Sequence, residues 1–428
     1  MDTQFGGGER RVSMNLSSRP AYPWLLLAMG TLGVFSALGL ARFGYTVILP
    51  PMQAGLGLDN TQTGALATAN LTGYLAFSAI GGALAAHLGP RLVIAAGLAV
   101  AGAGMLLTGM ADGFATAALW RAVTGLGSGA ANVAVMGMWA GWFPAHRRGM
   151  ASGVAVTGSS LALILVGPLA PAIINQAGTD GWRQCWYLFG TLSLAIALLC
   201  WLLIRNRPET ARSLDLGTPY GMADSPVQSN KPEGWGHVYR SWPVWHLGLV
   251  YVAFGFSYII FMTFFVKHLM AAGGYTRTAA GGLFMTMGWI SLICGLLWGS
   301  VSDRIGRKWA LMIVYLIHST AFALFSLSHS PTGFTAAALL FGISAWSIPA
   351  IMAAACGDVL GHRMAPAALG FITLFFGTGQ AIAPSVAGAM ADAAGSFTPA
   401  LLLAAAVALL GALGAATLHP APGQKTPP

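Results

Sequence analysis

Charged residues are scarce in this chain. Of its 428 residues, 8% are charged and 56% are hydrophobic. Soluble domains carry about 25% charged residues, so this chain has too few to cover a water-facing globule of its length. Because apolar stretches recur along the whole sequence, we expect lipid to be the solvent for most of the fold.

Sequence motifs for several kinds of chemistry are missing. There is no P-loop, no HExxH zinc pair and no GxSxG elbow, so we expect no direct use of ATP, no enzyme activity, no metal and no cofactor. The four cysteines fall in or beside apolar segments without a CxxC pair, which is typical of packing residues. The net charge of +9 is spread over short loops instead of one patch, which argues against a nucleic-acid partner.

A cleavable signal peptide is not predicted either. Residues 1–20 are polar and glycine-rich, and the first apolar run is longer than the h-region of such a peptide. We therefore expect a loose tail at the N-terminus, with Met14 as an alternative start.

Long apolar segments dominate the rest of the sequence. An α-helix needs roughly 20 apolar residues to cross a bilayer, and twelve segments meet this requirement. They are residues 23–49, 60–86, 91–111, 114–142, 149–175, 183–204, 242–268, 278–301, 308–328, 332–357, 364–391 and 397–418. The stretch 205–241 is polar and holds four prolines, so it is predicted to be a linker. We therefore expect an all-α membrane protein with twelve transmembrane helices.

Most of the 21 lysines and arginines fall on one side of these spans. If the N-terminus is inside, the outside segments hold only Arg183, Lys267 and Arg277. Positive residues concentrate in cytoplasmic loops. We therefore predict a multi-pass protein of the plasma membrane, in this case a bacterial inner membrane, with both termini and the linker in the cytoplasm.

The sequence repeats itself at a constant offset. Residues 82–91, GALAAHLGPR, align with residues 299–308, GSVSDRIGRK, and the same offset pairs Gly178 with Gly395. Such matches run from the second span to the loop after the fifth, which chance similarity among Gly/Ala-rich helices does not predict. We expect two pseudo-symmetric six-helix halves. The predicted domains are a tail (1–22), a first half (23–204), the linker (205–241), a second half (242–418) and a tail (419–428).

Several motifs resemble those of the major facilitator superfamily of transporters. GSVSDRIGRK closely matches its loop signature G-x-x-x-D-R-x-G-R-K, between the second and third helices of a half. Residues 121–129, RAVTGLGSG, resemble the fourth-helix motif, and residues 142–153 and 181–183 resemble the starts of the fifth and sixth helices. The resemblance covers residues 20–418. Residues 40–45, LARFGY, are similar to bacterial members related to the monocarboxylate and oxalate/formate porters.

The loop signature gathers one acid and three cations: Asp303, Arg304, Arg307 and Lys308. The cations alone are explained by topology, because they keep the loop inside. The acid is not, and a carboxylate can cap a helix N-terminus. The resemblance implies that Asp303 faces the start of the fifth helix of the other half, at Gly149, so we expect a conformational latch, with topology alone as the alternative. The first half has Ala86 in place of Asp303.

Two cations lie inside predicted spans, Arg42 in the first and Arg121 in the fourth. A charge at the centre of a span costs about 2.5–3.5 kcal/mol on insertion scales, so it usually faces the interior of the bundle. For Arg42, a substrate contact competes with snorkelling to the outer interface. For Arg121, which belongs to the fourth-helix motif, packing and a transport role are both open.

No aspartate or glutamate lies deep in any predicted span. The aspartates nearest to the spans fall at their ends: Asp59, Asp112, Asp180, Asp358 and Asp392. Carriers of cations and drugs commonly need a membrane-embedded carboxylate. Two arginines without an acid favour an anionic substrate, which a guanidinium can hold through two parallel hydrogen bonds.

Polar and aromatic residues at helical spacing extend this candidate substrate site. Tyr45 follows Arg42 by about one turn, and Asn132 follows Arg121 by about three turns. The other candidates are Tyr251, Tyr258, Ser344 and Ser347. They lie in the first, fourth, seventh and tenth spans, which line the cavity in the resembled family. For each side chain alone, hydrogen bonding between helices is the competing explanation.

These features predict a secondary transporter that moves a small organic anion, such as a monocarboxylate, by alternating access. The coupling mode stays open between a proton and a counter-anion, because arginine does not readily release a proton. We expect a small-molecule substrate and the lipid bilayer as partners, and a monomer. A drug or metabolite exporter and a carrier of neutral solutes are the alternatives, and a non-transporting membrane sensor is a third.

Overall fold

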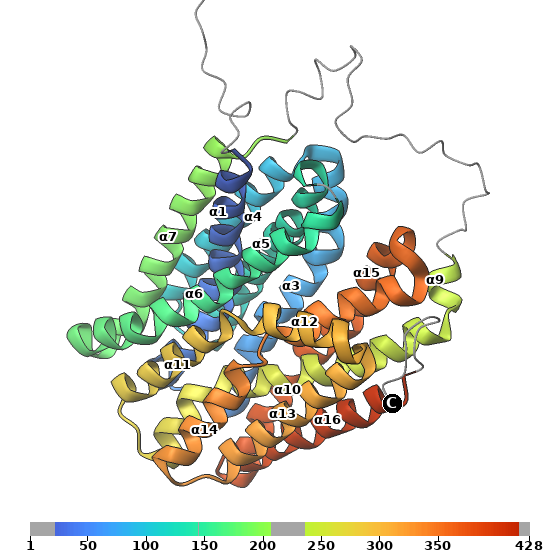
Figure 1. Cartoon of the computed structure of the whole chain (residues 1–428). Coiled ribbons are helices and arrows are strands. Elements are labelled where there is room, and N and C mark those ends of the chain that lie inside the picture. The colour runs from blue at the N-terminus through green and yellow to red at the C-terminus, as the bar shows by residue number, and fades with distance from the viewer. Residues whose placement is uncertain (1–21, 144, 207–235, 419–428) are drawn as a thin grey trace, which may run out of the picture.

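The computed structural model describes residues 22–143, 145–206 and 236–418, and every element in these ranges is a helix (Figure 1). The predicted tails, apart from Tyr22, and most of the predicted linker lie outside the described residues. We call the end of the molecule where α7 ends and α10 begins the linker end, and the opposite end the far end.

The first half contains six spans, and its first span is built from three consecutive helical pieces. These are α1 (Tyr22–Val34), the π-helix η2 (Phe35–Phe43) and α2 (Gly44–Leu56). The other helices are α3 (Asn60–Leu88), α4 (Pro90–Gly109), α5 (Phe114–Trp142), α6 (Ala145–Ala177), the 3-10 turn η3 (Gly178–Asp180) and α7 (Gly181–Leu203).

The second half follows a short helix, α9 (Gly236–Arg240), and also has six spans. Its helices are α10 (Trp242–Gly273), α11 (Arg277–Ser291), α12 (Cys294–Ile305), α13 (Arg307–Leu327), α14 (Pro331–Gly342), α15 (Ser347–Ala394) and α16 (Thr398–Ala416). The pair α11 and α12 forms one span that is bent by 43°. The long α15 contains a kink at Gly361, so its first part completes the tenth span and its second part is the eleventh.

The number of spans follows from these pieces. In the described residues, eight helical stretches are long and apolar enough to cross a membrane, and two bent pairs raise the number to ten. One of the eight, Arg147–Leu203, joins α6 and α7 and so crosses twice. The remaining crossing is α5, whose apolar character is diluted by Arg121, Ser128 and Asn132. The fold is therefore all-α with twelve spans.

The outer surface of the bundle is apolar, as a lipid-facing surface must be. Large side chains such as Trp24, Leu296 and Leu410 have more than half of their area exposed, at 69%, 74% and 63%. A water-soluble protein would not leave so many large apolar side chains exposed.

The backbone turns confirm the internal repeat. In the described residues, seven glycines have positive φ, and six of them form three pairs at the offset found in the sequence. The φ values are 63° and 64° for Gly57 and Gly274, 88° and 88° for Gly89 and Gly306, and 66° and 68° for Gly178 and Gly395. A side chain would strain these turns, so glycine is retained in both copies although the surrounding residues differ.

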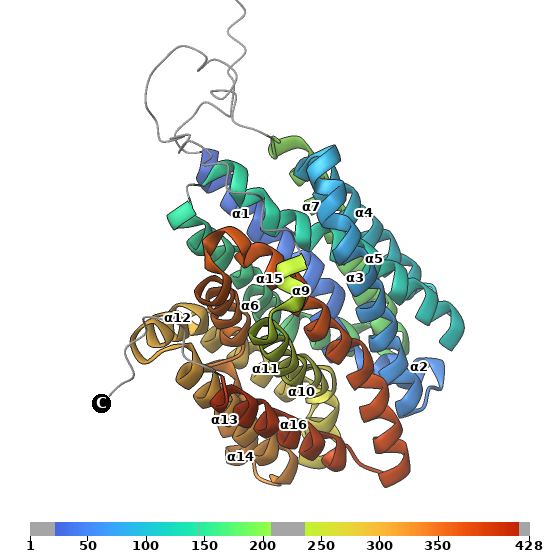
Figure 2. The ribbon, with the colours of Figure 1, turned by 90° about the vertical axis from the view of Figure 1, so that its right-hand side faces the viewer.

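The two halves pack through α3 against α15 and through α6 against α11, and Figure 2 shows α3 and α15 side by side. Both contacts rest on glycine. A Cβ atom added to Gly64 would lie 2.1 Å from the carbonyl oxygen of Pro384, and one added to Gly281 would lie 2.1 Å from that of Gly167. The two contacts are related by the repeat, because Gly64 corresponds to Gly281 and Gly167 to Pro384.

Candidate functional site

Arg42 lies at the end of the π-helix of the first span, between the two halves. π-Helical segments are wider than α-helices and frequently mark functional sites. This one packs closely on α6, because a Cβ atom added to Gly39 would lie 2.1 Å from the Cβ atom of Ala162. The Arg42 side chain is only 8% exposed, so the alternative of snorkelling to an interface does not describe its position.

The guanidinium of Arg42 contacts both halves but is not fully satisfied. It lies 4.3 Å from the centroid of the Tyr74 ring on α3. Its Nη1 donates a hydrogen bond of 3.4 Å to the hydroxyl oxygen of Tyr258 on α10. Its Nε and Nη2 are buried and have no partner among the described residues. Buried donors are rarely left unpaired, and those of a charged group carry the largest penalty, so this edge of the guanidinium is suited to an anion.

Tyr258 links Arg42 to the eleventh span. Its hydroxyl oxygen also accepts a hydrogen bond from the Nε2 of Gln380 on α15, which is 1% exposed. The Arg42 Nη1 and the Gln380 Nε2 can donate hydrogen bonds but cannot accept them. No described residue accepts the proton of the Tyr258 hydroxyl, so this hydroxyl can donate to a bound molecule.

Asn132 belongs to the same site through Tyr74. The Asn132 Nδ2 donates a hydrogen bond of 2.8 Å to the Tyr74 hydroxyl. Its Oδ1 is buried without a partner in the described part of the chain. The site thus offers two donors on Arg42 and one acceptor on Asn132, all without a partner in the described residues.

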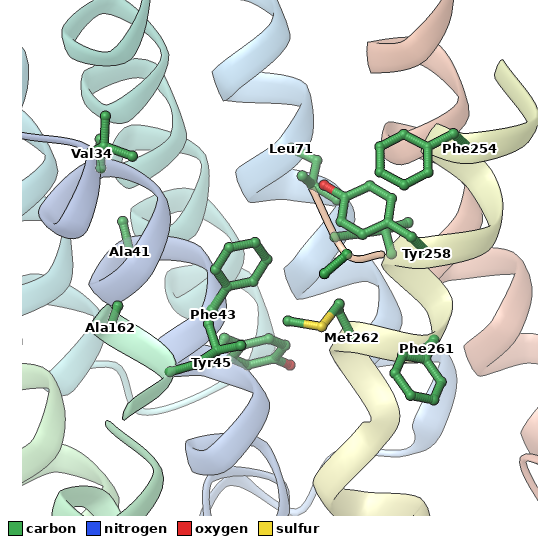
Figure 3. Close-up of a cluster of buried hydrophobic side chains, with 14 of the residues drawn as sticks. Val34, Ala41, Phe43, Tyr45, Leu71, Ala162, Phe254, Tyr258, Phe261 and Met262 are labelled. Atoms are coloured by element: carbon green, nitrogen blue, oxygen red, sulfur yellow. The ribbon is translucent and has the colours of Figure 1, made fainter. Parts of the chain in front are cut away.

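Aromatic rings form the second half's side of the site. Tyr251, Phe254, Tyr258 and Phe376 are nearly parallel, with interplanar angles between 3° and 17°. The ring of Trp346 stands at 82° to that of Tyr258, with 6.5 Å between their centroids. In Figure 3, the side chain of Met262 extends from α10 toward the first span, where Phe43 and Tyr45 lie. Tyr251 and Tyr258, both predicted from the sequence, are therefore part of one aromatic wall.

Arg121 is placed differently from Arg42. It is 1% exposed, and its Nη1 donates a hydrogen bond of 2.7 Å to the carbonyl oxygen of Ala41, in the π-helix. Its guanidinium lies 4.8 Å and 5.0 Å from the rings of Tyr45 and Trp186. A π-helix leaves carbonyl groups without their usual α-helical partner, and Arg121 satisfies one of them. This geometry favours the packing role for Arg121.

Three other predicted site residues use their hydroxyl groups locally. Tyr45 donates to the carbonyl oxygen of Thr63 over 2.9 Å. Ser344 donates to the carbonyl oxygens of Leu340 and Phe341, and Ser347 donates to that of Ser344. Both serines lie at the break between α14 and α15, where the helical hydrogen-bond pattern is interrupted. For these three residues, the contacts match the competing explanation of bonding within the helix bundle.

The predicted latch residues lie together at the linker end. The Asp303 Oδ1 is 2.5 Å from the Arg307 Nη1, and the Arg307 Nε is 3.1 Å from the Asp358 Oδ2. Arg304 is exposed, and the Lys308 Nζ lies 5.6 Å from the centroid of the Trp309 ring. Asp303 is thus paired within its own half in this structure.

Gly149, the predicted partner of Asp303, is exposed in this structure. A Cβ atom added to it would meet nothing within 4 Å. The predicted contact between the halves at the linker end is therefore not made in this conformation, and it stays a prediction for another one.

The far end holds a contact of the kind predicted for the linker end. Asp392, in the last turn of α15, accepts hydrogen bonds from the backbone N–H groups of Asn60 and Thr61 over 3.0 Å and 2.7 Å. These groups are in the first turn of α3, where a carboxylate is stabilised by free N–H groups. The Lys267 ammonium donates to the side-chain oxygens of Asn60 and Gln53.

The repeat places a neutral version of this contact beside it. Asn175, at the position of α6 that corresponds to Asp392, contacts the first turn of α11. Its Oδ1 accepts from the Arg277 Nη1 over 2.9 Å, and its Nδ2 donates to the Thr278 Oγ1 over 3.2 Å. Arg277 and Thr278 correspond to Asn60 and Thr61. In the part of the chain that is described, the hydrogen bonds between the halves lie in the middle and at this far end.

Comparison with known proteins places the chain in a family. Residues 34–416 match the family described as uncharacterised MFS-type transporter YbfB, within the major facilitator superfamily. The chain belongs to this family. It is 25% identical over 408 residues to the probable sulfoacetate transporter SauU of Cupriavidus necator, covering 89% of this chain and 90% of that protein. It is 24% identical over 390 residues to the hexuronate transporter of Bacillus subtilis, covering 87% and 89%.

A solved structure supports the fold of this MFS-type transporter. The crystal structure of a bacterial homolog to the human lysosomal transporter Spinster, in an inward-facing and occupied conformation, superposes with a TM-score of 0.74 at 16% identity. The superposition covers 93% of this chain and 97% of that chain. The predicted superfamily and the twelve-helix architecture are confirmed.

Sequence reasoning missed Tyr74, Trp346 and Gln380 of this MFS-type transporter's candidate site. Tyr74 and Gln380 lie in the second and eleventh spans, outside the four spans from which candidates were taken. A glutamine deep in an apolar span was a detectable signal, since a polar side chain there usually faces the bundle interior. Trp346 gave no such signal, because tryptophan is common throughout the chain. In the described residues, no group of three potential metal ligands lies together.

Proposed function

We propose that this MFS-type transporter moves a small organic anion by alternating access, and that the anionic group binds to Arg42. The observation that carries this proposal is the buried Nε and Nη2 of Arg42, which have no partner among the described residues. A guanidinium edge with two parallel donors matches the two oxygens of a carboxylate. Arg42 also contacts Tyr74 of one half and Tyr258 of the other, so the proposed anion-binding group bridges the two halves.

The names of the relatives support an anionic substrate. The two relatives described above are named for sulfoacetate and for hexuronate, and both of these molecules carry at least one acidic group. The described spans also lack an acid near Arg42. The proposal therefore agrees with the chemistry of the site without requiring that the substrate be the same.

The arrangement of contacts supports an assignment of the conformational state. If the linker and both termini are cytoplasmic, as the distribution of positive charge indicates, the far end faces outward. The halves are joined there through Asp392 and Asn175, while Asp303 is paired within its own half. We assign this structure to the inward-facing state, and we propose that Asp303 caps the N-terminus of α6 near Gly149 in the outward-facing state.

The remaining properties follow the same proposal. The protein works as a monomer in a bacterial inner membrane, as a transporter and not as an enzyme, and without a cofactor. Exchange against a counter-anion needs no titrating side chain, whereas proton symport needs a proton carrier other than arginine. A pH gradient applied across proteoliposomes separates the two modes.

Uptake of labelled small organic acids into proteoliposomes tests the proposal. We expect Arg42→Ala and Arg42→Lys to raise the half-saturation concentration by roughly ten- to hundredfold, because a charge-assisted hydrogen bond is lost and an ammonium cannot replace the planar fork. Arg183→Lys is the matched control, since Arg183 pairs with Asp112 and Asp180 at the far end. Normal uptake by both Arg42 variants at matched protein levels would contradict the proposal.

A further inference from the structure

We propose that the substrate is a flat aromatic monocarboxylate with a hydrogen-bond donor at the end opposite its carboxylate. This inference rests on the proposed function, because it uses Arg42 as the binding group for the anion. It starts from three buried polar atoms of the site that have no partner in the described residues: the Nε and Nη2 of Arg42 and the Oδ1 of Asn132.

The charge of the site selects a single anionic group. Arg42 has two buried donors without a partner in the described residues, whereas Arg121 has one, its Nε. The Arg121 guanidinium is otherwise held by the carbonyl oxygen of Ala41 and by the rings of Tyr45 and Trp186. One carboxylate therefore matches the free edge of Arg42. A second anionic group on the same molecule would find no second guanidinium edge with two free donors, and burying a charge without such hydrogen bonds is strongly unfavourable.

The free donors select a planar head group. Nε and Nη2 lie along one edge of the guanidinium and are free, whereas Nη1 is already bonded to Tyr258. Two parallel donors in one plane fit the two oxygens of a carboxylate. The Tyr258 hydroxyl, which has no described acceptor for its proton, can add a third hydrogen bond to the same group.

Tyr74 sets the length of the molecule. Arg42 lies over the face of the Tyr74 ring, and Asn132 donates to the Tyr74 hydroxyl. A ligand that joins the free edge of Arg42 to the free Oδ1 of Asn132 therefore spans from the face of the Tyr74 ring to beyond its hydroxyl. A benzene ring with substituents at its opposite ends can bridge such a span, and Oδ1 is an acceptor, so the far substituent must be a donor.

The aromatic wall favours a flat body. Phe376, one of its four nearly parallel rings, is partly exposed. Aromatic faces favour another flat ring through offset stacking. A molecule rich in hydroxyl groups would find few partners, because the side-chain amide of Gln380 already donates to Tyr258, and Ser344 and Ser347 donate to backbone carbonyls.

Equilibrium binding of labelled 4-hydroxybenzoate to the purified full-length protein tests this inference. The competitors differ from it in defined ways: benzoate and 4-methoxybenzoate lack the donor, 4-hydroxycyclohexanecarboxylate is not flat, terephthalate has a second carboxylate in place of the donor, and glucuronate has many hydroxyl groups and no aromatic ring. We expect each competitor to bind at least severalfold more weakly than 4-hydroxybenzoate.

One variant tests whether the donor of the ligand binds to the Oδ1 of Asn132. Asn132→Leu removes the Oδ1 together with the Nδ2 that donates to Tyr74, and we expect 4-hydroxybenzoate to bind roughly tenfold more weakly, the equivalent of one hydrogen bond. Benzoate has no donor for the Oδ1, so it should lose less affinity than 4-hydroxybenzoate, and the melting temperature of the variant controls for folding. An equal loss for both ligands would remove Asn132 from recognition and overturn the inference.

The outcomes separate the two proposals. One outcome is that glucuronate, terephthalate or 4-hydroxycyclohexanecarboxylate binds as tightly as 4-hydroxybenzoate in an Arg42-dependent way. In that case the inference of an aromatic monocarboxylate is wrong, and the proposed transport of an organic anion stands. If no acid of the panel binds in an Arg42-dependent way and none is taken up by proteoliposomes, both proposals fail.

Discussion

Asp392 and Thr61 join the last turn of α15 in one half to the first turn of α3 in the other. The Asp392 Oδ2 accepts from the backbone N–H of Thr61 over 2.7 Å and from its hydroxyl over 2.6 Å. The Asp392 Oδ1 accepts from the N–H of Asn60. One carboxylate thus satisfies two of the free N–H groups at the start of α3, so it stabilises the state in which the far end is closed.

Replacing Asp392 by asparagine should open the far end. An amide has one acceptor oxygen in place of two and no charge to favour the helix N-terminus, so it cannot hold both N–H groups. We expect the outward-facing population to rise by roughly three- to tenfold. The measurement is labelling of Thr46→Cys from the outside, because Thr46 is 2% exposed here and donates to the carbonyl oxygen of Met262 in the other half.

Asp180→Asn is the matched control for this experiment. It removes the same charge at the same end, but Asp180 pairs with Arg183 of its own half. Labelling should therefore stay at the level of the Thr46→Cys protein. Equal labelling of the Asp392 and Asp180 variants would show that Asp392 does not close the far end.

Asp303→Asn should shift the population in the opposite direction. The proposed contact of Asp303 with the start of α6 stabilises the outward-facing state, so its loss favours the conformation described here. We expect slower uptake and less labelling of Thr46→Cys, with Asp303→Glu retaining more of both because it keeps the charge. Unchanged uptake and unchanged labelling of the Asp303→Asn protein would show that Asp303 is not a conformational latch, and topology alone would then explain the charged loop.

Two neighbouring glycines test the close contact between α6 and α11. In Gly281→Ala, the added Cβ atom would lie 2.1 Å from the carbonyl oxygen of Gly167, so the halves must separate at this point. We expect the far end to open and uptake to fall. In Gly282→Ala, the new atom meets nothing within 4 Å, so this variant should behave as the unmodified protein. Similar uptake by the two variants would show that the close contact between α6 and α11 does not affect transport.

Arg121→Lys should reduce stability and leave affinity unchanged. The guanidinium of Arg121 bonds to the carbonyl oxygen of Ala41 and lies against two aromatic rings, and an ammonium reproduces neither contact well. We expect the melting temperature in detergent to fall by several degrees, with the half-saturation concentration of the transported acid unchanged. A raised half-saturation concentration at an unchanged melting temperature would instead make Arg121 part of the substrate site.

The architecture was accessible from sequence because it depends on local rules. Spans follow from runs of apolar residues, and the repeat was visible in pairs such as Gly178 and Gly395, which adopt the same left-handed turn in both halves. The breaks inside spans were not predictable. The π-helix over residues 35–43 and the bend between α11 and α12 arise from packing against other helices, such as the contact of Gly39 with Ala162.

The site was only partly predictable, because a sequence shows which polar residues are in a span but not what they contact. Arg42 and Tyr258 were found, since a buried charge and a tyrosine on a cavity-lining span are strong signals. Tyr45 has the same signal, yet its hydroxyl is used by the backbone of α3. The distinction depends on side-chain direction in three dimensions, which spacing along one helix does not give.

The paired turns draw attention to where the two copies of the repeat differ. The turn glycines stayed the same in both copies, whereas the acids did not: Asp303 and Asp392 both belong to the second copy, and Ala86 and Asn175 stand at the equivalent positions of the first. In the proposed cycle, the second copy therefore supplies the carboxylate at each end of the membrane, and the first copy supplies the helix ends that receive them. The two copies are therefore not interchangeable in this cycle, and the choice of open side depends on two single-residue differences between them.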